Sequence, residues 1–428
     1  MIIPSIDLMD GNAVQLVQGK KKVLDAGDPR PIAEKFGRVG EVAVVDLDAA
    51  LGRGSNSAVM EELLALAPCR VGGGIRDAET AKAWLDRGAT KVVLGTAARP
   101  EVLGELPPER VVVALDARHG EVVVEGWQKG TGSGVAERMR ELDGLAGGYL
   151  VTFVEREGGL GGLDLDQVRE LIDAAGDARL TVAGGVATAS EIGAVDRLGA
   201  DAQIGMALYT GKFRLADALA ESLQSDREDG LWPTVVSDVH GTTLGLAWSD
   251  RESLDTAIER GVGAYRSRKR GLWVKGETSG ATQTLHRVEL DCDRDALHFV
   301  VGQEGDGFCH QSTWSCFGNA SGLPALARKL AARRNDAPPG SYTRRLFEDP
   351  ELLASKIREE ADELVRAESR EDVIHEAADV LYFTLARLAR EGIGLDEVER
   401  ALDRRALRIS RRPGDAKPSP SSTEETSR

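Results

Sequence analysis

The sequence is poor in cysteine and in positive charge, and it has no long apolar run. Its 428 residues include four cysteines, and 54 Lys and Arg face 70 Asp and Glu, a formal net charge of −16. So acidic a chain is not a general nucleic-acid binder, because such proteins gain affinity by neutralising phosphates. No apolar run approaches the ~20 residues that span a bilayer, and the start lacks the basic stretch of a signal peptide. We therefore expect free thiols and a cytoplasmic protein with no membrane or nucleic-acid partner.

Three segments of different character follow one another, as the length of a multidomain chain allows. Residues 1–223 alternate short apolar strands with helix-period segments, which favours a closed (β/α)8 TIM barrel. Residues 229–330 are mainly strand-like and hold three cysteines, so we expect a small, mainly-β zinc domain (α+β). Residues 340–411 predict an all-α domain, and 412–428, rich in Ser, Pro and Glu, predict a disordered tail.

The expected elements are short in the barrel and long at the end of the chain. The barrel strands are predicted at residues 2–6, 42–47, 70–73, 91–95, 111–116, 149–153, 180–183 and 202–205. Helices of the last domain are predicted at about 348–367, 370–391 and 395–410.

The barrel segment repeats itself with an offset of about 110 residues, which indicates two fused half-barrels. Glycine-rich turns after strands three, four, seven and eight offer backbone N–H groups to anions. The turn residues are Gly73, Gly74, Gly95, Thr96, Gly184, Gly185 and Gly205. One such turn is more often only a tight turn, but two symmetric pairs suggest a ligand with a phosphate at each end. Asp7 and Asp116 close opposite strands and suit general acid–base work, although either one alone is as well explained as a helix cap.

Specific stretches give the barrel segment a family resemblance. They are Ile3-Pro4-Ser5-Ile6-Asp7, Gly72-Gly73-Gly74-Ile75-Arg76, Leu115-Asp116-Ala117-Arg118 and Gly126-Trp127. The segment resembles the ProFAR isomerases of histidine biosynthesis. The resemblance implies an Amadori rearrangement with Asp7 and Asp116 as acid–base residues, Thr152 as an assisting hydroxyl and Trp127 stacked on the substrate.

The sequence also departs from the pattern of that family. Gln15 and Met206 stand where the family has Arg, and Glu157-Gly158-Gly159 stands for Asp-Gly-Thr. A glutamine cannot replace the bidentate anion contacts of an arginine. A barrel that only binds a ligand or serves as a scaffold is therefore the alternative to an isomerase.

The middle segment carries a dense set of candidate metal ligands. Asp291, Asp293 and Asp295 would share one face of a strand, where Mg²⁺ would relieve their repulsion. Cys292 would point to the opposite face, where Cys309 and Cys316 would complete three thiolate ligands and leave one position of Zn²⁺ open for water. A half-lost structural zinc site, or chance cysteines beside a solvated acidic strand, is the alternative.

A basic and hydroxyl-rich cluster precedes these ligands. Its members suit a phosphate or phosphoribosyl grip rather than a plain solvated turn: Ser267, Arg268, Arg270, Trp273, Lys275, Thr278, Ser279 and Gly280. With Asp-Cys-Asp-x-Asp and Cys-His, residues 229–320 resemble the phosphoribosyl-AMP cyclohydrolases. The resemblance implies opening of the adenine ring by zinc-bound hydroxide, with His310 as a candidate proton shuttle.

Carboxylates recur at a spacing of three on the C-terminal helices. Glu360 with Glu363, and Glu376 with Asp379, lie on single helical faces near apolar neighbours. Four converging carboxylates indicate Mg²⁺, whereas a lone pair would be only a solvated face. Residues 340–411 resemble the phosphoribosyl-ATP pyrophosphohydrolases, which implies Mg²⁺-dependent release of pyrophosphate.

The three resemblances name consecutive steps on phosphoribosyl nucleotides, in reverse order along the chain. They predict a multifunctional histidine-biosynthesis enzyme, and both hydrolase resemblances imply a homodimer. The alternatives are a bifunctional hydrolase with a non-catalytic barrel and a non-enzymatic nucleotide-binding regulator.

Overall fold

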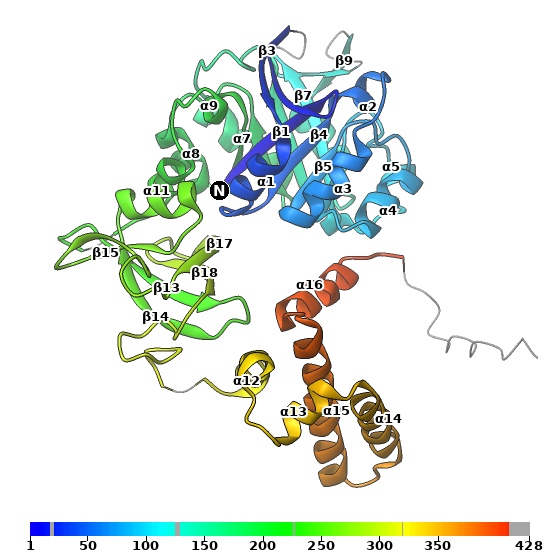
Figure 1. Cartoon of the computed structure of the whole chain (residues 1–428). Helices are drawn as coiled ribbons and strands as arrows, with labels where there is room; N and C mark the ends of the chain where they lie inside the picture. The colour runs from blue at the N-terminus through cyan, green and yellow to red at the C-terminus, as the bar shows by residue number, and fades with distance from the viewer. Residues whose placement is uncertain (18–20, 125–128, 226, 319, 411–428) are drawn as a thin grey trace, which may run out of the picture.

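The structure is a computed structural model, and it describes residues 1–17, 21–124, 129–225, 227–318 and 320–410. Three blocks are visible in Figure 1: a barrel, a small β-sheet block beside it, and a helical block below both. Among the described residues no helix is both long and apolar enough to cross a membrane.

Eight parallel strands close the barrel, because β7 pairs with β10 as well as with β6. In barrel order they are β1 (Ile2–Met9), β4 (Val42–Asp46), β5 (Cys69–Gly72), β6 (Lys91–Leu94), β7 (Val111–Arg118), β10 (Gly148–Phe153), β11 (Arg179–Ala183) and β12 (Asp201–Ile204). Val112, Leu150 and Ala183 pack together from three of these strands, as expected for a filled barrel interior. The predicted TIM barrel and its eight strands are confirmed.

Helices surround the barrel, and two hairpins extend it. The helices are α1 (Pro29–Gly37), α2 (Leu47–Leu51), α3 (Ser57–Leu66), α4 (Ala78–Asp86), α5 (Pro100–Leu103), α6 (Val135–Glu141), α7 (Leu165–Ala175), α8 (Ala189–Arg197), α9 (Met206–Tyr209) and α10 (Leu215–Ser222). The hairpins, which the sequence did not predict, are β2 (Asn12–Val17) with β3 (Lys21–Gly27), and β8 (Glu121–Val124) with β9 (Lys129–Gly134). They follow β1 and β7, the first strands of the two half-barrels, so the internal repeat extends to these additions.

The middle block is a four-stranded sheet with one helix and a separate hairpin. The sheet order is β14 (Thr243–Ser249), β13 (Trp232–Asp238), β18 (Leu297–Gln303) and β17 (Gln283–Leu290), and the other elements are α11 (Arg251–Arg260), β15 (Ala264–Ser267) and β16 (Gly271–Val274). Helix α11 begins after Asp250, whose carboxylate accepts from the N–H of Ser253, and ends at the left-handed Gly261.

The helical block contains α12 (Gly322–Asp336), α13 (Tyr342–Glu348), α14 (Pro350–Arg366), α15 (Arg370–Glu391) and α16 (Leu395–Ala406). The three predicted long helices are thus present as α14, α15 and α16. Helix α12 runs past residue 330, where the predicted middle domain ends, and continues up to Asp336. Leu330 of α12 is buried with Leu346, Leu353 and Phe383, so α12 belongs to the helical block by its packing.

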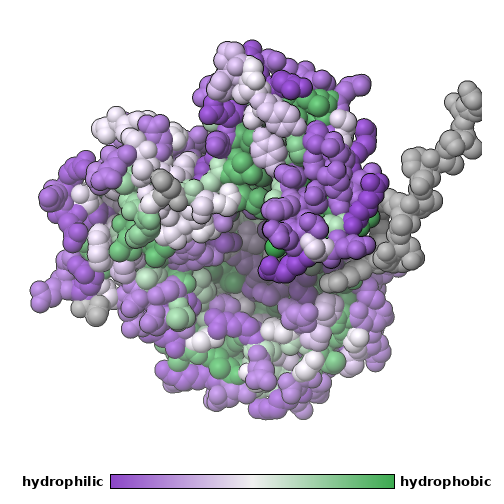
Figure 2. Space-filling view, turned by 90° about the horizontal axis from the view of Figure 1, so that it is seen from below, coloured by the Kyte–Doolittle hydropathy of each residue, from purple (hydrophilic) through white to green (hydrophobic). Residues whose placement is uncertain are grey.

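Polar contacts dock the blocks on one another. Arg294 of the β17–β18 loop lies 3.0 Å from Asp196 of the barrel helix α8. His240, after β13, lies 2.7 Å from Glu399 of α16, and Arg404 of the same helix donates to the carbonyl of Ala65 in the barrel at 3.4 Å. Helix α16 therefore touches both other blocks (Figure 1). Figure 2 shows this underside as mostly hydrophilic, with apolar patches and a hollow near its centre.

Candidate functional sites

Asp7 and Asp116 lie on opposite sides of the barrel mouth. Their strands, β1 and β7, are four strands apart in a closed ring of eight. Ile6 and Leu8 pack outward in the main core, so the alternation along β1 points Asp7 into the barrel. Asp116 is in register with Thr152 of β10. Each lies an even number of residues after an interior residue of its own strand, Val112 and Leu150, and therefore points to the same face. The structure therefore brings Thr152 beside Asp116, across the mouth from Asp7.

Burial gives Asp7 an unusual protonation equilibrium. It raises the pKa of this carboxyl from 3.8 to about 7, because removing water from a carboxylate disfavours its charged form. Tyr209 of α9 is close by: its hydroxyl donates to the carbonyl of Ser5 at 3.3 Å. Burial and the neighbouring Asp7 both raise the pKa of Tyr209, so this hydroxyl stays protonated. Tyr209 was missed from the sequence, where nothing links α9 to β1.

The glycine turns form two opposite pairs, after β5 and β6 and after β11 and β12. A Cβ on Gly73 would overlap the backbone of Asp46 at the end of β4, and one on Gly184 would overlap Phe153 at the end of β10. Both have positive φ, +89° and +85°. These two glycines are therefore required by the packing of the barrel itself. Among the described residues, no atom lies within 4 Å of a Cβ added at Gly95, so its turn leaves room for a ligand.

The remaining turn residues differ in their surroundings. Thr96 is exposed beside Gly95, and Gly74 and Gly185 pack against Ala49 and Arg156. Gly205 lies against the buried side chain of Gln15, whose Nε2 donates to the carbonyl of Val14 at 2.9 Å. Gln15 thus fills space under a candidate phosphate turn. Trp127, expected to stack on the substrate, lies outside the described residues.

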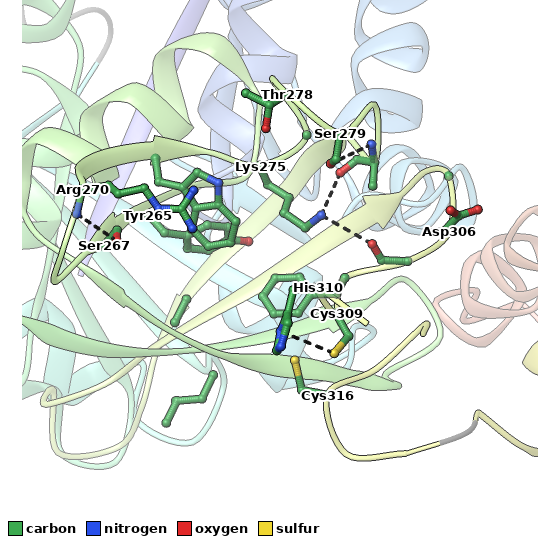
Figure 3. A pocket seen from close by; sticks show the side chains of 18 of the residues that line it. Tyr265, Ser267, Arg270, Lys275, Thr278, Ser279, Asp306, Cys309, His310 and Cys316 are labelled. Atoms are coloured by element: carbon green, nitrogen blue, oxygen red, sulfur yellow. Dashed lines mark hydrogen bonds between the residues drawn. The ribbon is translucent and has the colours of Figure 1, made fainter. Parts of the chain in front are cut away.

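A cavity of about 770 Å³ opens in the middle block (Figure 3). All members of the predicted basic and hydroxyl-rich cluster line it: Ser267, Arg268, Arg270, Trp273, Lys275, Thr278, Ser279 and Gly280. Cys309, His310 and Cys316 lie on its opposite wall. The structure therefore joins the candidate phosphate grip and two candidate zinc ligands in one cavity.

Lys275 has a different environment from the one expected of a phosphate contact. Its Nζ is directed to the carbonyl oxygens of Ala281, at 3.1 Å, and Gly307, at 3.4 Å, and the side chain is buried (Figure 3). Burial lowers the pKa of Lys275, whereas Cys316 acts in the opposite direction. Its contacts tie together the two loops that form the cavity floor.

Cys309 and Cys316 both line the cavity, and each influences the pKa of the other. The N–H of Gln311 and then the hydroxyl of Thr313 lower the pKa of Cys309, which favours the thiolate that binds metals. Burial raises the pKa of Cys316, and so does Cys309. His310 lies beside the pair, with its Nδ1 3.9 Å from the Sγ of Cys309. Two neighbouring thiols at an open cavity fit part of a catalytic zinc site, which has three protein ligands and one free position.

Cys292 does not join this pair within the chain, contrary to the expectation from strand alternation. Strand β17 ends at Leu290 and β18 begins at Leu297, so Cys292 lies in the loop between them. Cys309 follows the other end of β18, a strand of seven residues and therefore roughly 23 Å long. The three cysteines of one chain cannot surround one ion.

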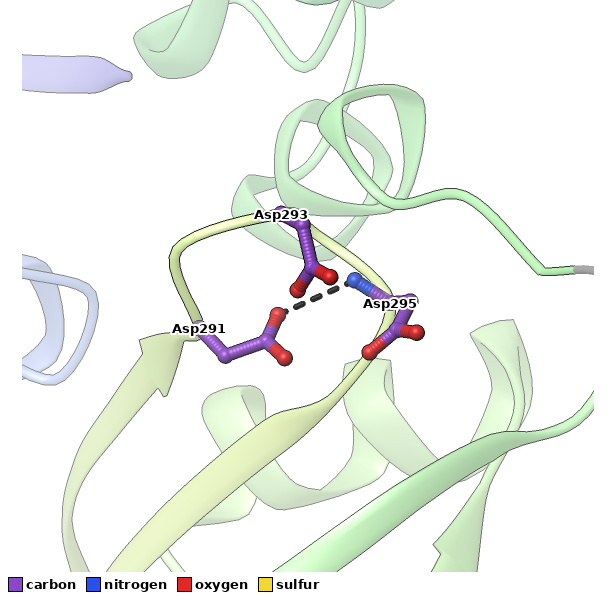
Figure 4. Close-up of side chains that lie close together, drawn as sticks. All are labelled: Asp291, Asp293 and Asp295. Atoms are coloured by element: carbon purple, nitrogen blue, oxygen red, sulfur yellow. Dashed lines mark hydrogen bonds between the residues drawn. The ribbon is translucent and has the colours of Figure 1, made fainter.

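Asp291, Asp293 and Asp295 gather in that same loop rather than on a strand (Figure 4). One oxygen from each lies within 4.8 Å of the others. Asp291 also accepts from the N–H groups of Asp295 and Ala296, both at 3.0 Å. Burial alone would raise the pKa of Asp291, but these hydrogen bonds outweigh it and lower the pKa. The loop turn, and not pleat alternation, brings the carboxylates together, and three oxygens at this spacing fit a hard cation.

The carboxylates of the helical block also converge. Oxygens of Glu360 and Glu363 on α14 and of Glu376 on α15 lie within 4.8 Å of one another. Burial, Glu363, Glu360 and Asp379 together raise the pKa of Glu376, which indicates that like charges crowd here. Asp379 is thus a neighbour of the cluster but not one of its three closest members. Lys356 pairs with Glu360 at 2.6 Å and provides a counter-charge.

A family model for histidine biosynthesis proteins matches residues 1–214, half of the chain. The chain belongs to this family. Models for phosphoribosyl-AMP cyclohydrolase and phosphoribosyl-ATP pyrophosphohydrolase match residues 245–318 and 323–406. Each match falls on the block that holds the corresponding cluster of residues.

Curated relatives of the histidine biosynthesis family match about half of the chain. A trifunctional protein of Komagataella pastoris is 54% identical over 207 residues, 48% of this chain and 25% of that protein. A bifunctional protein of Schizosaccharomyces pombe is 50% identical over 206 residues, 48% of this chain and 49% of that protein. An imidazole-4-carboxamide isomerase of Halobacterium salinarum is 44% identical over 232 residues, 51% of this chain and 96% of that protein. The chain spans from a quarter to a half of the first two.

Proposed function

We propose that this histidine biosynthesis protein catalyses three consecutive reactions. The helical block hydrolyses phosphoribosyl-ATP to phosphoribosyl-AMP and pyrophosphate, the middle block opens the adenine ring, and the barrel isomerises the product. The observation that carries the proposal is the coincidence of three family matches with three separate clusters of suitable residues. The three reactions share one series of phosphoribosyl substrates, so their union in one chain is chemically coherent.

In the barrel, Asp7 and Asp116 act as the acid–base pair. A carboxyl with a pKa of about 7 can both hold and release a proton near neutral pH, which is what general acid–base catalysis needs. Thr152 supports Asp116 from the next strand. The two opposite pairs of glycine turns bind the two phosphates of the substrate. The substrate then lies across the mouth of the barrel, between the two carboxylates.

In the middle block, the cavity holds the phosphoribosyl nucleotide against two thiols. Ser267, Arg268 and Arg270 bind phosphate, and Trp273 covers the sugar or base. When bound at the thiolates, zinc lowers the pKa of a water and so supplies the nucleophile for ring opening. His310, beside Cys309, moves the proton. The aspartates at 291, 293 and 295 hold Mg²⁺.

A homodimer completes the thiolate set. Because Cys292 and Cys309 lie at opposite ends of β18, the third thiolate at the cavity comes from Cys292 of the partner subunit. Exposed apolar side chains on α14 and α15 provide further surface for pairing: Val365, Val373, Ile374 and Leu381.

Mixing two inactive full-length variants, Cys292→Ala and Cys309→Ala, tests this arrangement. Random pairing restores one intact site in half of the dimers, so about a quarter of the cyclohydrolase activity returns. No recovery, in a mixture shown to exchange subunits, contradicts the shared site.

In the helical block, the carboxylates of α14 and α15 hold Mg²⁺ next to the phosphates of the nucleotide. Mg²⁺ held there would supply charge neutralisation for the phosphates and activation of a water. Glu360 is buried and stays fixed by Lys356, so it anchors the set. Glu363, Glu376 and Asp379 complete it from the two helix faces.

Three substitutions in the full chain separate the activities. Asp116→Asn should abolish isomerisation alone, Cys309→Ser ring opening alone, and Glu363→Gln pyrophosphate release alone. Each activity is measured with its own substrate, so that loss of one does not hide another. Unsubstituted protein that binds the isomerase substrate without turning it over would favour the bifunctional alternative with a non-catalytic barrel. Loss of all three activities from any one substitution would refute the separate sites.

A further inference from the structure

A buried carboxylate in the middle block has all of its acceptor positions occupied. Asp238, at the end of β13, is 2% exposed. One of its oxygens accepts from the N–H groups of His240, at 3.1 Å, and Thr242, at 2.9 Å. The other accepts from Trp314 Nε1, at 2.9 Å, and from Arg328 Nη1, at 3.2 Å. A carboxylate has about four lone-pair positions, so Asp238 has none left for a metal or a substrate and acts through its partners.

Trp314 is built into the loop that carries Cys309 and Cys316. Its carbonyl accepts from the N–H of Phe308 at 3.2 Å, one residue before Cys309. Cys316, two residues after Trp314, donates its N–H to the carbonyl of Leu244 at 2.8 Å. The indole is therefore anchored in the same loop that carries both thiols of the cavity in Figure 3.

Arg328 joins the same contact from the helical block. Its guanidinium lies 4.0 Å from the centre of the Trp314 ring, and the same helix, α12, buries Leu330 in the helical core. Nη2 of Arg328 is buried with no hydrogen-bond partner among the described residues. The guanidinium thus leaves one buried nitrogen without a hydrogen bond, while it stacks on the indole and pairs with Asp238. This is the pattern of a side chain that holds its neighbours in position.

We propose that Asp238, Trp314 and Arg328 form a positioning unit that holds the loop of Cys309 and Cys316 in its metal-binding shape. Since Arg328 belongs to α12, the unit makes that shape depend on the docking of the helical block. The inference rests on the proposed zinc site for its consequence, but its geometry is independent of any metal.

Full-chain variants test the unit. Trp314→Phe keeps an aromatic ring and loses the donor to Asp238, whereas Arg328→Met removes the charge and keeps the length. Lys329→Met is the matched control, because Lys329 is the next residue of α12 and is exposed. Zinc affinity is measured by competition with a chromogenic chelator. Alkylation of each cysteine in metal-free protein is followed by mass spectrometry, and the buried Cys69 of the barrel serves as the internal reference for global unfolding.

We expect Trp314→Phe and Arg328→Met to weaken zinc binding about 10- to 100-fold, as is usual when residues that orient ligands are removed. Cys309 and Cys316 should be alkylated faster in both variants, Cys69 should stay as protected as in the parent, and pyrophosphate release should persist. Arg328→Lys, which keeps the charge but not the planar stacking, should fall between. Unchanged affinity and unchanged alkylation in both variants would overturn the inference. A parent protein that takes up no zinc would refute the proposed zinc site, while the alkylation rates would still decide the positioning role.

Discussion

Asp7→Asn should stabilise the barrel in a way that grows with pH, while it destroys isomerisation. The folded protein raises the pKa of Asp7 from 3.8 to about 7. Between pH 3.8 and about pH 7, Asp7 binds more protons in the folded state than in the unfolded state. The free energy of unfolding therefore falls as the pH rises through this range. The amide of the Asp7→Asn variant does not titrate, so the variant does not lose stability in this way as the pH rises.

The magnitude follows from the shift. From pH 5 to pH 8 the titration of Asp7 costs the native barrel about 2–3 kcal/mol, at ~1.4 kcal/mol per pKa unit. Because Asp7 is only half-buried by surface area, about 1–2 kcal/mol is the realistic gain for the amide over that range. Removal of a general acid–base group should lower the isomerisation rate by about 10²–10⁴-fold.

The assay is urea unfolding of the full chain at pH 5, 6.5 and 8, and hydrogen exchange of the barrel strands is the readout. Asp10→Asn is the matched control, because Asp10 follows the same strand and its side chain is exposed. The stability difference between Asp7→Asn and the parent should widen from pH 5 to pH 8, and that for Asp10→Asn should stay constant. A difference that is the same at both ends of the range would refute the raised pKa and, with it, the acid–base role derived from burial.

Two further predictions concern the glycine turns and the helical carboxylates. Gly73→Ala should cost the barrel more than about 3 kcal/mol, because φ is +89° and the new Cβ would overlap the backbone at Asp46; Gly95→Ala, with open space around it, should cost less than about 1 kcal/mol in urea unfolding. Equal costs would contradict this account of the turns. Saturating Mg²⁺, at about 100 times its dissociation constant, should protect the amides of α14 and α15 by about 3 kcal/mol in hydrogen exchange. Glu363→Gln should remove most of this protection and Asp362→Asn, on the neighbouring exposed position, should retain it; equal protection in both would exclude Glu363 as a ligand.

The barrel was predictable because its pattern is local. Each strand is a short apolar run between turns, and the run decides strand or helix without help from distant residues. The hairpins β2–β3 and β8–β9 were missed, since they carry glycine and charge and extend strands that the pattern had already ended. Helix α12 was missed because the residues that bury its Leu330 come from α13, α14 and α15, later in the chain.

The candidate sites divide in the same way. The sequence by itself determined which residue types are present at chemically useful spacings: the aspartates at 291, 293 and 295, the Cys-His pair at 309 and 310, and the carboxylates on α14 and α15. Spacing is a property of the chain, so it was readable. The tertiary structure alone decided which of them meet. It placed Cys292 a strand length away from Cys309, turned Lys275 to two carbonyls, set Tyr209 beside Asp7 and joined Asp238 to Trp314 and Arg328. Such contacts depend on how strands and helices pack across long sequence separations, and no local pattern encodes them.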